Sequence, residues 1–281
     1  MIFINGVLIV NKPEGLTSRD VINVLNRKFE TKRIGHTGTL DPLATGVLVV
    51  AVGSYTKLVN ELTSLDKEYI AEIKLGIKTD TDDITGTVLE EDNNYNIKKE
   101  DIVKVFNSFP KEYEQTVPKY SAVKVGGKKL YEYARNNIDV ELPTRLVKIY
   151  ELELIDYNSD VIKFRVKVSK GTYIRSLIED LCKKLNAIGT MCSLVRTKQG
   201  KFRIEDSHIL DEININTKLL DSKDILDIKD YVLNDYEYKL VSNGNKLNIE
   251  LEDGYYNVVY NNENVAIYKF IYNEGRLLMF Y

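Results

Sequence analysis

The chain has 281 residues, of which 43% are hydrophobic and 29% are charged, and its formal net charge is −3. This composition predicts an ordered globular protein, with one large domain or a catalytic domain and a small appendage, and excludes long disordered segments. The apolar runs are shorter than the roughly 18 residues of a membrane span, and residues 1–15 lack signal-peptide features. Cys182 and Cys192 indicate neither a disulfide framework nor a zinc site, so we expect a cytoplasmic protein without a metal and without a membrane partner.

Residues 1–60 alternate short apolar runs with turns. The apolar start of the chain, through GVLIVN, predicts a buried strand, and SRDVINVLNRKF predicts a helix with Ser18 as its N-cap. A glycine-rich segment follows, GHTGTLDPLATG at residues 35–46, and GVLVVAVG predicts the next strand. The expected order is therefore strand, helix, loop, strand.

The middle of the chain predicts further strands and helices. Residues 66–92 alternate with period two and are broken by Asp, Thr and Gly, which predicts strands in a meander. Residues 98–109 predict a short amphipathic helix, and the polar, tyrosine-rich section at about 124–148 predicts a protruding loop or a hairpin with one helix. VIKFRVKVS at 161–169 predicts a strand, and GTYIRSLIEDLCKKL at 171–185 has the apolar spacing of a helix.

The C-terminal part differs in composition from the rest. Residues 204–229 form a connection rich in Asp and Asn, with weak periodicity. Beyond it, strand-like pieces are separated by the turn sequences NGN, EDG, NNEN and NEG. We expect a compact β-module of about fifty residues, which is too small to be stable unless it docks on the main body.

The net charge conceals a strong asymmetry along the chain. Residues 161–203 hold eleven Lys and Arg against two Asp and Glu, whereas residues 204–281 hold seven against fifteen. The first segment predicts a basic surface large enough for a polyanion. The alternative is a solvated face of one strand and one helix.

Asp41, between Leu40 and Pro42, is the candidate functional carboxylate. An Asp before Pro is also a good helix N-cap with proline in the first turn, so a purely structural role is the alternative. The functional interpretation is a carboxylate on a rigid loop whose glycines let the backbone approach a planar ligand closely.

Three other segments resemble known motifs. RIGHTG at residues 33–38 matches the loop of KH domains, which clamps nucleic-acid backbone, and a non-catalytic RNA-binding protein is therefore an alternative from another class. VGGKKL lacks the Ser or Thr and the spacing of a phosphate loop. TDTDD, residues 79–83, lacks the EF-hand spacing and predicts a polar turn.

Five collinear segments resemble bacterial tRNA pseudouridine synthases of the TruB family, which isomerise uridine 55 in the T loop. They are NKPEGLTS at 11–18, GHTGTLDPLATGVL at 35–48, KEYIAEIKLGIKTDTDDITG at 67–86, VPKYSAVKVGGKKLYEYAR at 117–135 and SKGTYIRSLIEDL at 169–181. The resemblance implies an α+β fold: a mixed, mainly antiparallel sheet with flanking helices forms the catalytic domain at residues 1–228. It also implies a thumb-like insertion at about 124–148 and a small PUA-like RNA-binding domain at 229–281.

The resemblance also assigns roles to individual residues. Asp41 matches the family's catalytic aspartate, and Arg175 matches the arginine that pairs with it. Tyr69 matches the tyrosine that packs against the target base, and Tyr173 and Leu194 match residues that line the base pocket.

Further residues are expected to contact the RNA outside the base pocket. His36 matches the histidine that enters the T loop when the target nucleotide leaves it. We expect the basic residues Lys124, Lys128, Lys129, Lys170 and Arg196 to contact the RNA backbone.

The resemblance leaves the catalytic route open, because the aspartate could attack C1′, attack C6 or assist a glycal route. No cofactor is demanded by the isomerisation. The expected partner is the T stem-loop of tRNA, and we expect a monomer without an obligate protein partner. The alternative within the class is the guide-dependent archaeal and eukaryotic relative.

Overall fold

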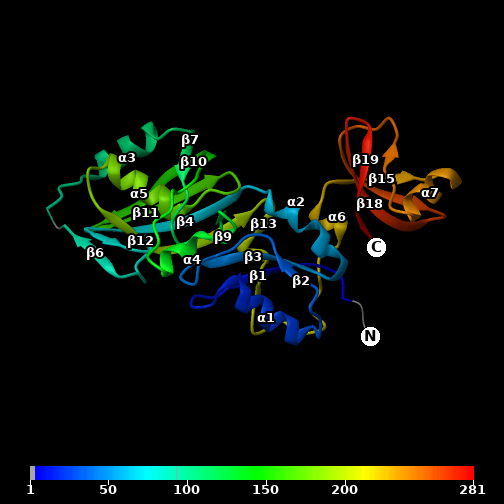
Figure 1. Cartoon of the computed structure of the whole chain (residues 1–281), viewed down its shortest axis with the longest axis horizontal. Coiled ribbons are helices and arrows are strands. Elements are labelled where there is room, and N and C mark those ends of the chain that lie inside the picture. The colour runs from blue at the N-terminus through cyan, green and yellow to red at the C-terminus, as the bar shows by residue number, and fades with distance from the viewer. Residues whose placement is uncertain (1–3, 93) are drawn as a thin grey trace.

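A ten-stranded mixed sheet forms the main body of the protein (Figure 1). The computed structural model describes residues 4–92 and 94–281; the first three residues of the predicted N-terminal strand segment lie outside them. The strand order is β14-β1-β3-β12-β4-β11-β10-β7, with β2 beside β3 and β13 beside β12. The strands are β1 (Gly6–Lys12), β2 (Ile34–His36), β3 (Thr45–Val52), β4 (Lys67–Leu75), β7 (Glu112–Thr116), β10 (Thr144–Asn158), β11 (Val161–Val168), β12 (Gly189–Gln199), β13 (Phe202–Arg203) and β14 (His208–Ile209).

Most neighbouring strands of this sheet are antiparallel; within its described residues only the strand pairs β1–β14 and β12–β3 are parallel. Helices α3 (Lys99–Ser108) and α5 (Ile174–Lys184) pack on the face of the sheet formed by alternate residues of β4 and β11. Strand β3 is buried on both faces, because helix α1 (Ser18–Lys28) covers one face and other apolar segments cover the other. The predicted α+β class with a mainly antiparallel sheet is confirmed.

The N-cap of helix α1 lies one residue earlier than predicted. Thr17, not Ser18, is the N-cap: its hydroxyl accepts from Asp20 N at 3.1 Å, and the Asp20 carboxylate accepts from Thr17 N at 2.9 Å. The Ser18 hydroxyl instead accepts a hydrogen bond from Leu40 N at 2.9 Å. Ser18 therefore ties α1 to the loop that carries Asp41, which is why it is buried rather than at a free helix end.

The predicted meander at residues 66–92 is wrong. Strand β4 lies between β11 and β12 in the large sheet, so both of its edges are occupied. Strands β5 (Ile77–Thr79) and β6 (Val88–Glu91) form a separate two-stranded sheet, after a break at Gly76 with φ +81°. The TDTDD segment is the predicted polar turn: Asp83 accepts from Thr85 N at 3.0 Å, and Asp80 accepts from Thr87 N at 2.7 Å.

A small hairpin followed by a helix is present in the predicted protruding section. Strands β8 (Lys124–Val125) and β9 (Lys128–Lys129) pair around two glycines, and helix α4 (Leu130–Arg135) follows directly. We call β8, β9 and α4 the thumb; Figure 1 shows it in green in front of the large sheet. The Tyr133 hydroxyl donates to Val125 O at 2.9 Å and holds the helix against the hairpin.

The C-terminal module is a five-stranded sheet with the order β15-β17-β18-β19-β16. Its strands are β15 (Ile228–Val232), β16 (Leu247–Asn248), β17 (Gly254–Tyr260), β18 (Glu263–Ile271) and β19 (Glu274–Phe280). Helix α7 (Asp235–Ser242) was not predicted, although Asn234 caps it through Glu237 N. The linking segment contains η2 (Ile204–Asp206), β14 and α6 (Ser222–Ile225).

The module docks on the main body, as its small size requires. Ile267 and Met279 are fully buried in one cluster with residues of η1 (Gly53–Leu58) and α2 (Val59–Thr63). Glu61 of α2 accepts from Lys269 Nζ at 2.7 Å and from the Tyr255 hydroxyl at 2.6 Å. The docking surface therefore immediately precedes β4 in the chain.

We expect Met279→Ala to lower the free energy of unfolding by about 2–5 kcal/mol, because it empties volume in this shared cluster. Urea unfolding followed by circular dichroism measures the change. Tyr272→Ala in the same module is the control, since Tyr272 is 90% exposed and should leave stability nearly unchanged. Equal stability of the Met279 variant and the unsubstituted chain would contradict a shared core.

Candidate active site

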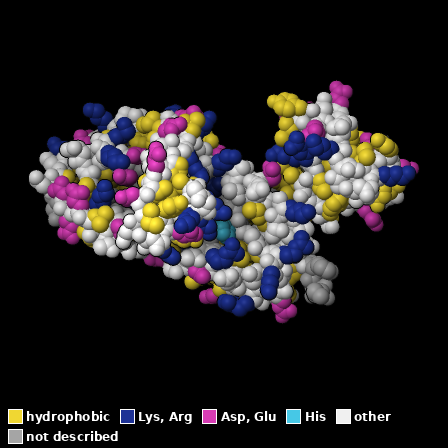
Figure 2. Space-filling model, viewed as in Figure 1, with side chains coloured by type: hydrophobic (Ala, Val, Ile, Leu, Met, Phe, Trp, Pro, Cys, Tyr) yellow, Lys and Arg dark blue, Asp and Glu magenta, His cyan; other side chains and the backbone are white. Residues whose placement is uncertain are grey.

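A cleft of about 960 Å³ lies where the Asp41 loop, strands β4 and β12, the start of α5 and the thumb meet. Seven of the sequence-predicted residues line it: Asp41, Tyr69, Lys170, Tyr173, Arg175, Leu194 and Arg196. They come from four segments that are far apart in the chain, and the fold brings them together. Lys and Arg side chains gather in the middle of the face shown in Figure 2, near the position of the thumb in Figure 1.

The loop that carries Asp41 is a turn and not a helix start. Ala44 N donates to Asp41 O at 3.0 Å, and strand β3 begins at the next residue. The helix N-cap alternative for Asp41 is therefore wrong. The KH alternative is also wrong, because the GHTG segment leaves β2 and leads toward β3, whereas a KH loop joins two helices.

Two buried cations fix this loop from below. Lys12 Nζ donates to Leu16 O at 2.6 Å and to Pro42 O at 3.3 Å, and burial lowers the pKa of Lys12 to about 8. Arg196 Nε donates to Val47 O at 2.6 Å, and its Nη2 donates to Gly38 O at 3.2 Å. Main-chain carbonyl groups accept these hydrogen bonds, so the loop is held at both ends.

Gly46 shows why the loop is rich in glycine. Its φ is +95°, and a Cβ at this position would lie 2.3 Å from Arg196 O. Strand β12 passes too close to β3 at this point for any side chain. The glycine thus permits the close strand approach that places Arg196 under the loop.

Arg175 and Asp41 form an ion pair at the floor of the cleft. Arg175 Nε lies 3.0 Å from Asp41 Oδ2, and Arg175 is 5% exposed, while the Asp41 side chain remains about one-third exposed at 34%. The remaining guanidinium nitrogens donate to Thr81 O at 3.0 Å and to Tyr120 O at 2.9 Å. Arg175 is thereby fixed by three segments and aims the carboxylate into the cleft.

Burial raises the pKa of Asp41, and the positive charge of Arg175 opposes that shift. Without the guanidinium, a carboxyl group in this position would lose its negative charge more readily. The ion pair therefore favours the carboxylate form of Asp41, which is the form that can act as a nucleophile or base.

Tyr69, Leu194 and Tyr173 form apolar walls around this pair. Tyr69 and Leu194 are each 7% exposed and lie on the neighbouring strands β4 and β12. Tyr173 precedes α5, and Gln115 fixes its main chain by accepting from Tyr173 N at 2.8 Å and donating to Tyr173 O at 3.1 Å. The geometry suits a flat ring held between aromatic and aliphatic side chains.

His36 lies at the end of β2, beside the cleft rather than in its lining. Burial lowers the pKa of His36, and the nearby Arg19 and Arg196 lower it further. Gly38 N donates to its Nδ1 at 3.5 Å. The ring is therefore neutral at physiological pH, a state suited to stacking on bases rather than to phosphate binding.

The expectation that Arg196 contacts RNA backbone is wrong. Arg196 is 1% exposed, and its hydrogen bonds go to carbonyl groups under the Asp41 loop, so it holds the loop. Lys170 is exposed and lines the cleft. Lys124 and Lys128 are exposed on the thumb, and Lys129 Nζ lies 5.3 Å from the centre of the Tyr131 ring. Their contacts with RNA stay predictions.

The predicted basic surface at residues 161–203 is largely neutralised on β11. Arg165 forms ion pairs with Glu68 at 2.9 Å and with two glutamates of β10, and Lys163 pairs with Glu72 at 2.9 Å. Glu68 and Glu72 belong to β4, far away in the chain, and the other two glutamates lie on β10, the strand before β11, so a charge count over residues 161–203 includes none of them. The positive charge that lines the cleft comes instead from Arg135 of the thumb and from Arg145 and Lys170.

The cleft also contains cations that sequence reasoning missed. Lys67 Nζ donates to Thr63 O and Leu65 O, both at 2.6 Å, and burial lowers the pKa of Lys67 to about 8. Arg135 and Arg145 also line the cleft. The buried position of Lys12, which holds the Asp41 loop, could have been predicted from the sequence. Lys12 alternates along the strand with the same period as Leu8 and Val10, so its side chain is expected to point to the same face as theirs.

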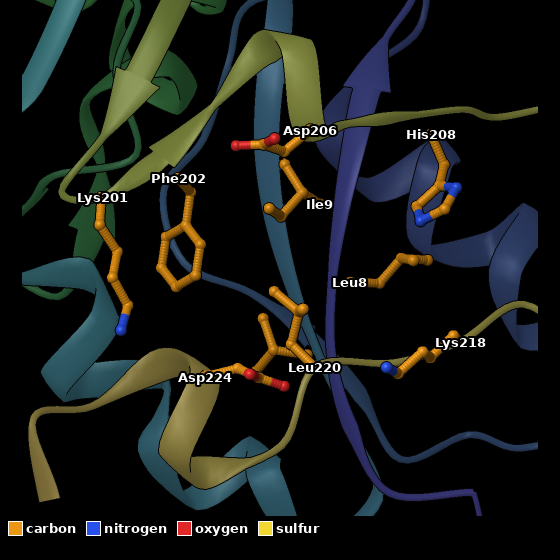
Figure 3. A pocket seen from close by; sticks show the side chains of 10 residues that line it. Leu8, Ile9, Lys201, Phe202, Asp206, His208, Lys218, Leu220 and Asp224 are labelled. Atoms are coloured by element: carbon orange, nitrogen blue, oxygen red, sulfur yellow. The ribbon is translucent and has the colours of Figure 1, made fainter.

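A second pocket, of about 280 Å³, lies at the outer edge of β1 (Figure 3). Figure 3 shows His208 and Lys218 on one side of it and Phe202 and Lys201 on the other. Leu8 and Ile9 supply its apolar wall, between the places where β1 pairs with β14 and with Leu220. It contains none of the residues around Asp41, so the chemistry belongs to the larger cleft.

Comparison with known proteins agrees with this geometry. Residues 26–174 match the model of the TruB family pseudouridylate synthase N-terminal domain, which is more than half of the chain. The chain belongs to the TruB family of pseudouridylate synthases. It is therefore an isomerase, and the sequence-based recognition is confirmed.

Two relatives show how far the likeness to the TruB family extends. The chain is 44% identical to tRNA pseudouridine synthase B of Caldicellulosiruptor saccharolyticus over 86% of this chain and 83% of that protein. It is 45% identical to tRNA pseudouridine synthase B of Bacillus subtilis over 75% of this chain and 70% of that protein. Both relatives are bacterial.

A solved Cbf5-Nop10-Gar1 complex contains a chain with the same fold. The TM-score is 0.67 and the identity is 24%, over 94% of this chain and 78% of that chain. At this identity the likeness shows the fold alone. Within the described residues, no helix has the length and apolar character needed to cross a membrane.

The ion pair yields a prediction for pH dependence. If Asp41 acts as a carboxylate, activity falls as the pH drops through the pKa of Asp41. Arg175→Gln removes the charge that opposes protonation, so the acid limb of kcat/KM against pH should move to higher pH by about one unit or more. Pseudouridine formation measured from pH 4 to 9 gives the profile.

Arg175→Lys is the matched control for this experiment. It also loses the hydrogen bonds to Thr81 and Tyr120, but it keeps the positive charge, so the rate should fall while the acid limb moves much less. An acid limb that stays in place for both variants would show that Arg175 does not control the ionisation of Asp41.

Proposed function

We propose that this chain converts uridine 55 in the T loop of tRNA to pseudouridine, with Asp41 as the catalytic residue. Membership of the TruB family supports the reaction, and the curated relatives are named tRNA pseudouridine synthase B. The observation that carries the residue assignment is the Asp41–Arg175 pair at the floor of an aromatic-walled cleft. The bacterial relatives, at 42–47% identity, favour a stand-alone enzyme over the guide-dependent alternative, whose solved structures are 22–24% identical.

The target base must leave its stack before it can react, which costs a few kcal/mol. Tyr69 offers a stacking surface, and such stacking returns about 1–3 kcal/mol per base. The neutral His36, beside the cleft, is placed to fill the vacated position in the loop. The cleft thereby compensates for part of the cost of extrusion.

The reaction breaks the N1–C1′ bond, turns the base and forms the C5–C1′ bond, while the proton on C5 is lost and N1 gains one. Atoms and electrons balance without a redox cofactor. The Asp41 carboxylate is the group available to attack C1′ or C6 or to remove a ribose proton. Tyr69 is the candidate group near C5 for the proton transfer.

The rest of the chain is assigned to binding. We assign residues 1–228 to the catalytic domain and residues 229–281 to a PUA-like RNA-binding domain that acts on the same tRNA. Lys170, with Lys124, Lys128 and Lys129 of the thumb, contacts the phosphate backbone, so affinity falls steeply with added salt. The protein acts as a monomer in the cytoplasm.

Asp41→Asn tests the catalytic assignment. The amide keeps the size of the side chain but has no negative charge, so turnover of a T stem-loop should fall below detection while RNA affinity stays within a few-fold. Nucleoside analysis measures pseudouridine, and filter binding measures affinity. Turnover near that of the unsubstituted chain would remove Asp41 from the chemistry.

Tyr69→Phe separates stacking from proton transfer. The ring remains, so we expect RNA binding to be kept while the single-turnover rate drops by roughly two orders of magnitude, the usual contribution of a general acid or base. Rapid-quench kinetics with excess enzyme measures the step. If the rate is unchanged, Tyr69 serves only as a stacking surface.

A further inference from the structure

One buried hydroxyl in the cleft wall has no partner within the protein. Among residues 4–92 and 94–281, four buried side-chain polar atoms lack a hydrogen-bond partner, and only Ser121 Oγ belongs to a residue that lines the cleft. Ser121 is 7% exposed. Leaving a buried hydroxyl without a hydrogen bond destabilises a protein, so its retention in a wall of the cleft calls for a reason.

The main chain on both sides of this hydroxyl is fixed. Tyr120 O accepts from Arg175 Nη2 at 2.9 Å, which links the segment to the ion pair with Asp41. Ser121 O accepts from Tyr131 N at 3.1 Å, which links it to the start of helix α4. Ser121 thus lies between the ion pair and the thumb, and no hydrogen bond within the described residues fixes its hydroxyl.

We propose that the Ser121 hydroxyl is a substrate-binding group that hydrogen-bonds the extruded nucleotide. Rotation about the Cα–Cβ bond turns Oγ into the cleft when the nucleotide enters. A hydroxyl can donate to a carbonyl oxygen of the base or accept from its imide N–H or from the ribose 2′-hydroxyl. The inference rests on the proposed function and adds a polar contact to a pocket otherwise described by its apolar walls.

A substrate-binding role and a structural role have opposite effects on stability. If Ser121 Oγ is reserved for substrate, Ser121→Ala removes an unpaired buried group, and the melting temperature should stay the same or rise. If the hydroxyl were bonded within the protein, the same change would lower the melting temperature. The combination of unchanged or higher stability with lower activity is therefore the diagnostic result.

Ser176→Ala is the matched control for Ser121→Ala. Ser176 is 5% exposed, lies on the neighbouring α5 outside the cleft lining, and its hydroxyl donates to Thr116 O at 2.8 Å. Its loss should lower the melting temperature, by a few degrees, and leave kcat/KM for a T stem-loop unchanged. Ser121→Ala should lower kcat/KM roughly 3- to 30-fold, as expected for one hydrogen bond to substrate, without lowering the melting temperature.

Modified stem-loops identify the contacted group. With 2′-deoxyuridine or 4-thiouridine at the target position, Kd is measured for the unsubstituted chain and for Ser121→Ala. If Ser121 contacts the ribose, its substitution has no further effect on the 2′-deoxy ligand; if it contacts O4, the effect disappears for the thio ligand. If Ser121→Ala raises Kd by the same factor for both modified stem-loops, the contact is with one of the remaining polar groups of the base.

Two outcomes would overturn this proposal without affecting the proposed function, and a third would overturn both. An unchanged kcat/KM for Ser121→Ala, in a preparation where the unsubstituted chain is active, would exclude the contact while leaving the proposed function intact. A melting temperature lowered as in Ser176→Ala would show that the hydroxyl already has a partner in the protein. If the unsubstituted chain forms no pseudouridine in the stem-loop, the proposed function fails first and this inference fails with it.

Discussion

The ion pair between Arg175 and Asp41 is the interaction on which the arrangement of the cleft depends. A guanidinium with 5% exposure must satisfy its nitrogens, and Arg175 does so with the carboxylate and with carbonyl groups of the TDTDD turn and of the segment that leads to the thumb. One side chain therefore joins the Asp41 loop, the β5–β6 hairpin and the segment that leads to the thumb. Burying such a pair is costly, so its value lies in orientation and in the ionisation of Asp41 rather than in stability.

The elements of the main sheet were largely predictable because their patterns are local. Strict alternation identifies β11, and continuous apolar residues identify β3. The prediction that failed, the meander at residues 66–92, depends on strands far away in the chain. Nothing within residues 66–92 reveals that β11 and β12 occupy both edges of β4, and this occupation prevents the meander.

The same distinction between local patterns and distant contacts applies to the residues of the candidate site. The resemblance to the TruB family identified Asp41, Tyr69, Tyr173, Arg175 and Leu194, and the fold places all five in the lining of one cleft. Arg196 was misjudged because a strand arginine is normally exposed, whereas here β3 approaches so closely at Gly46 that the guanidinium is covered. Ser121 was missed for another reason: the lack of a hydrogen-bond partner is a property of three-dimensional surroundings and leaves no trace in a sequence pattern.

The docking of the C-terminal sheet on η1 and α2 has a geometric consequence. Glu61, which contacts the C-terminal sheet through Lys269 and Tyr255, is only eight positions before Tyr69 in the chain. Lys67, between them, bonds back to the carbonyl groups at the end of α2 and stiffens this short connection. The separation between the C-terminal sheet and the cleft is thus set by a short, hydrogen-bonded connection. Under the proposed function, an RNA bound at both places would be held at a fixed spacing.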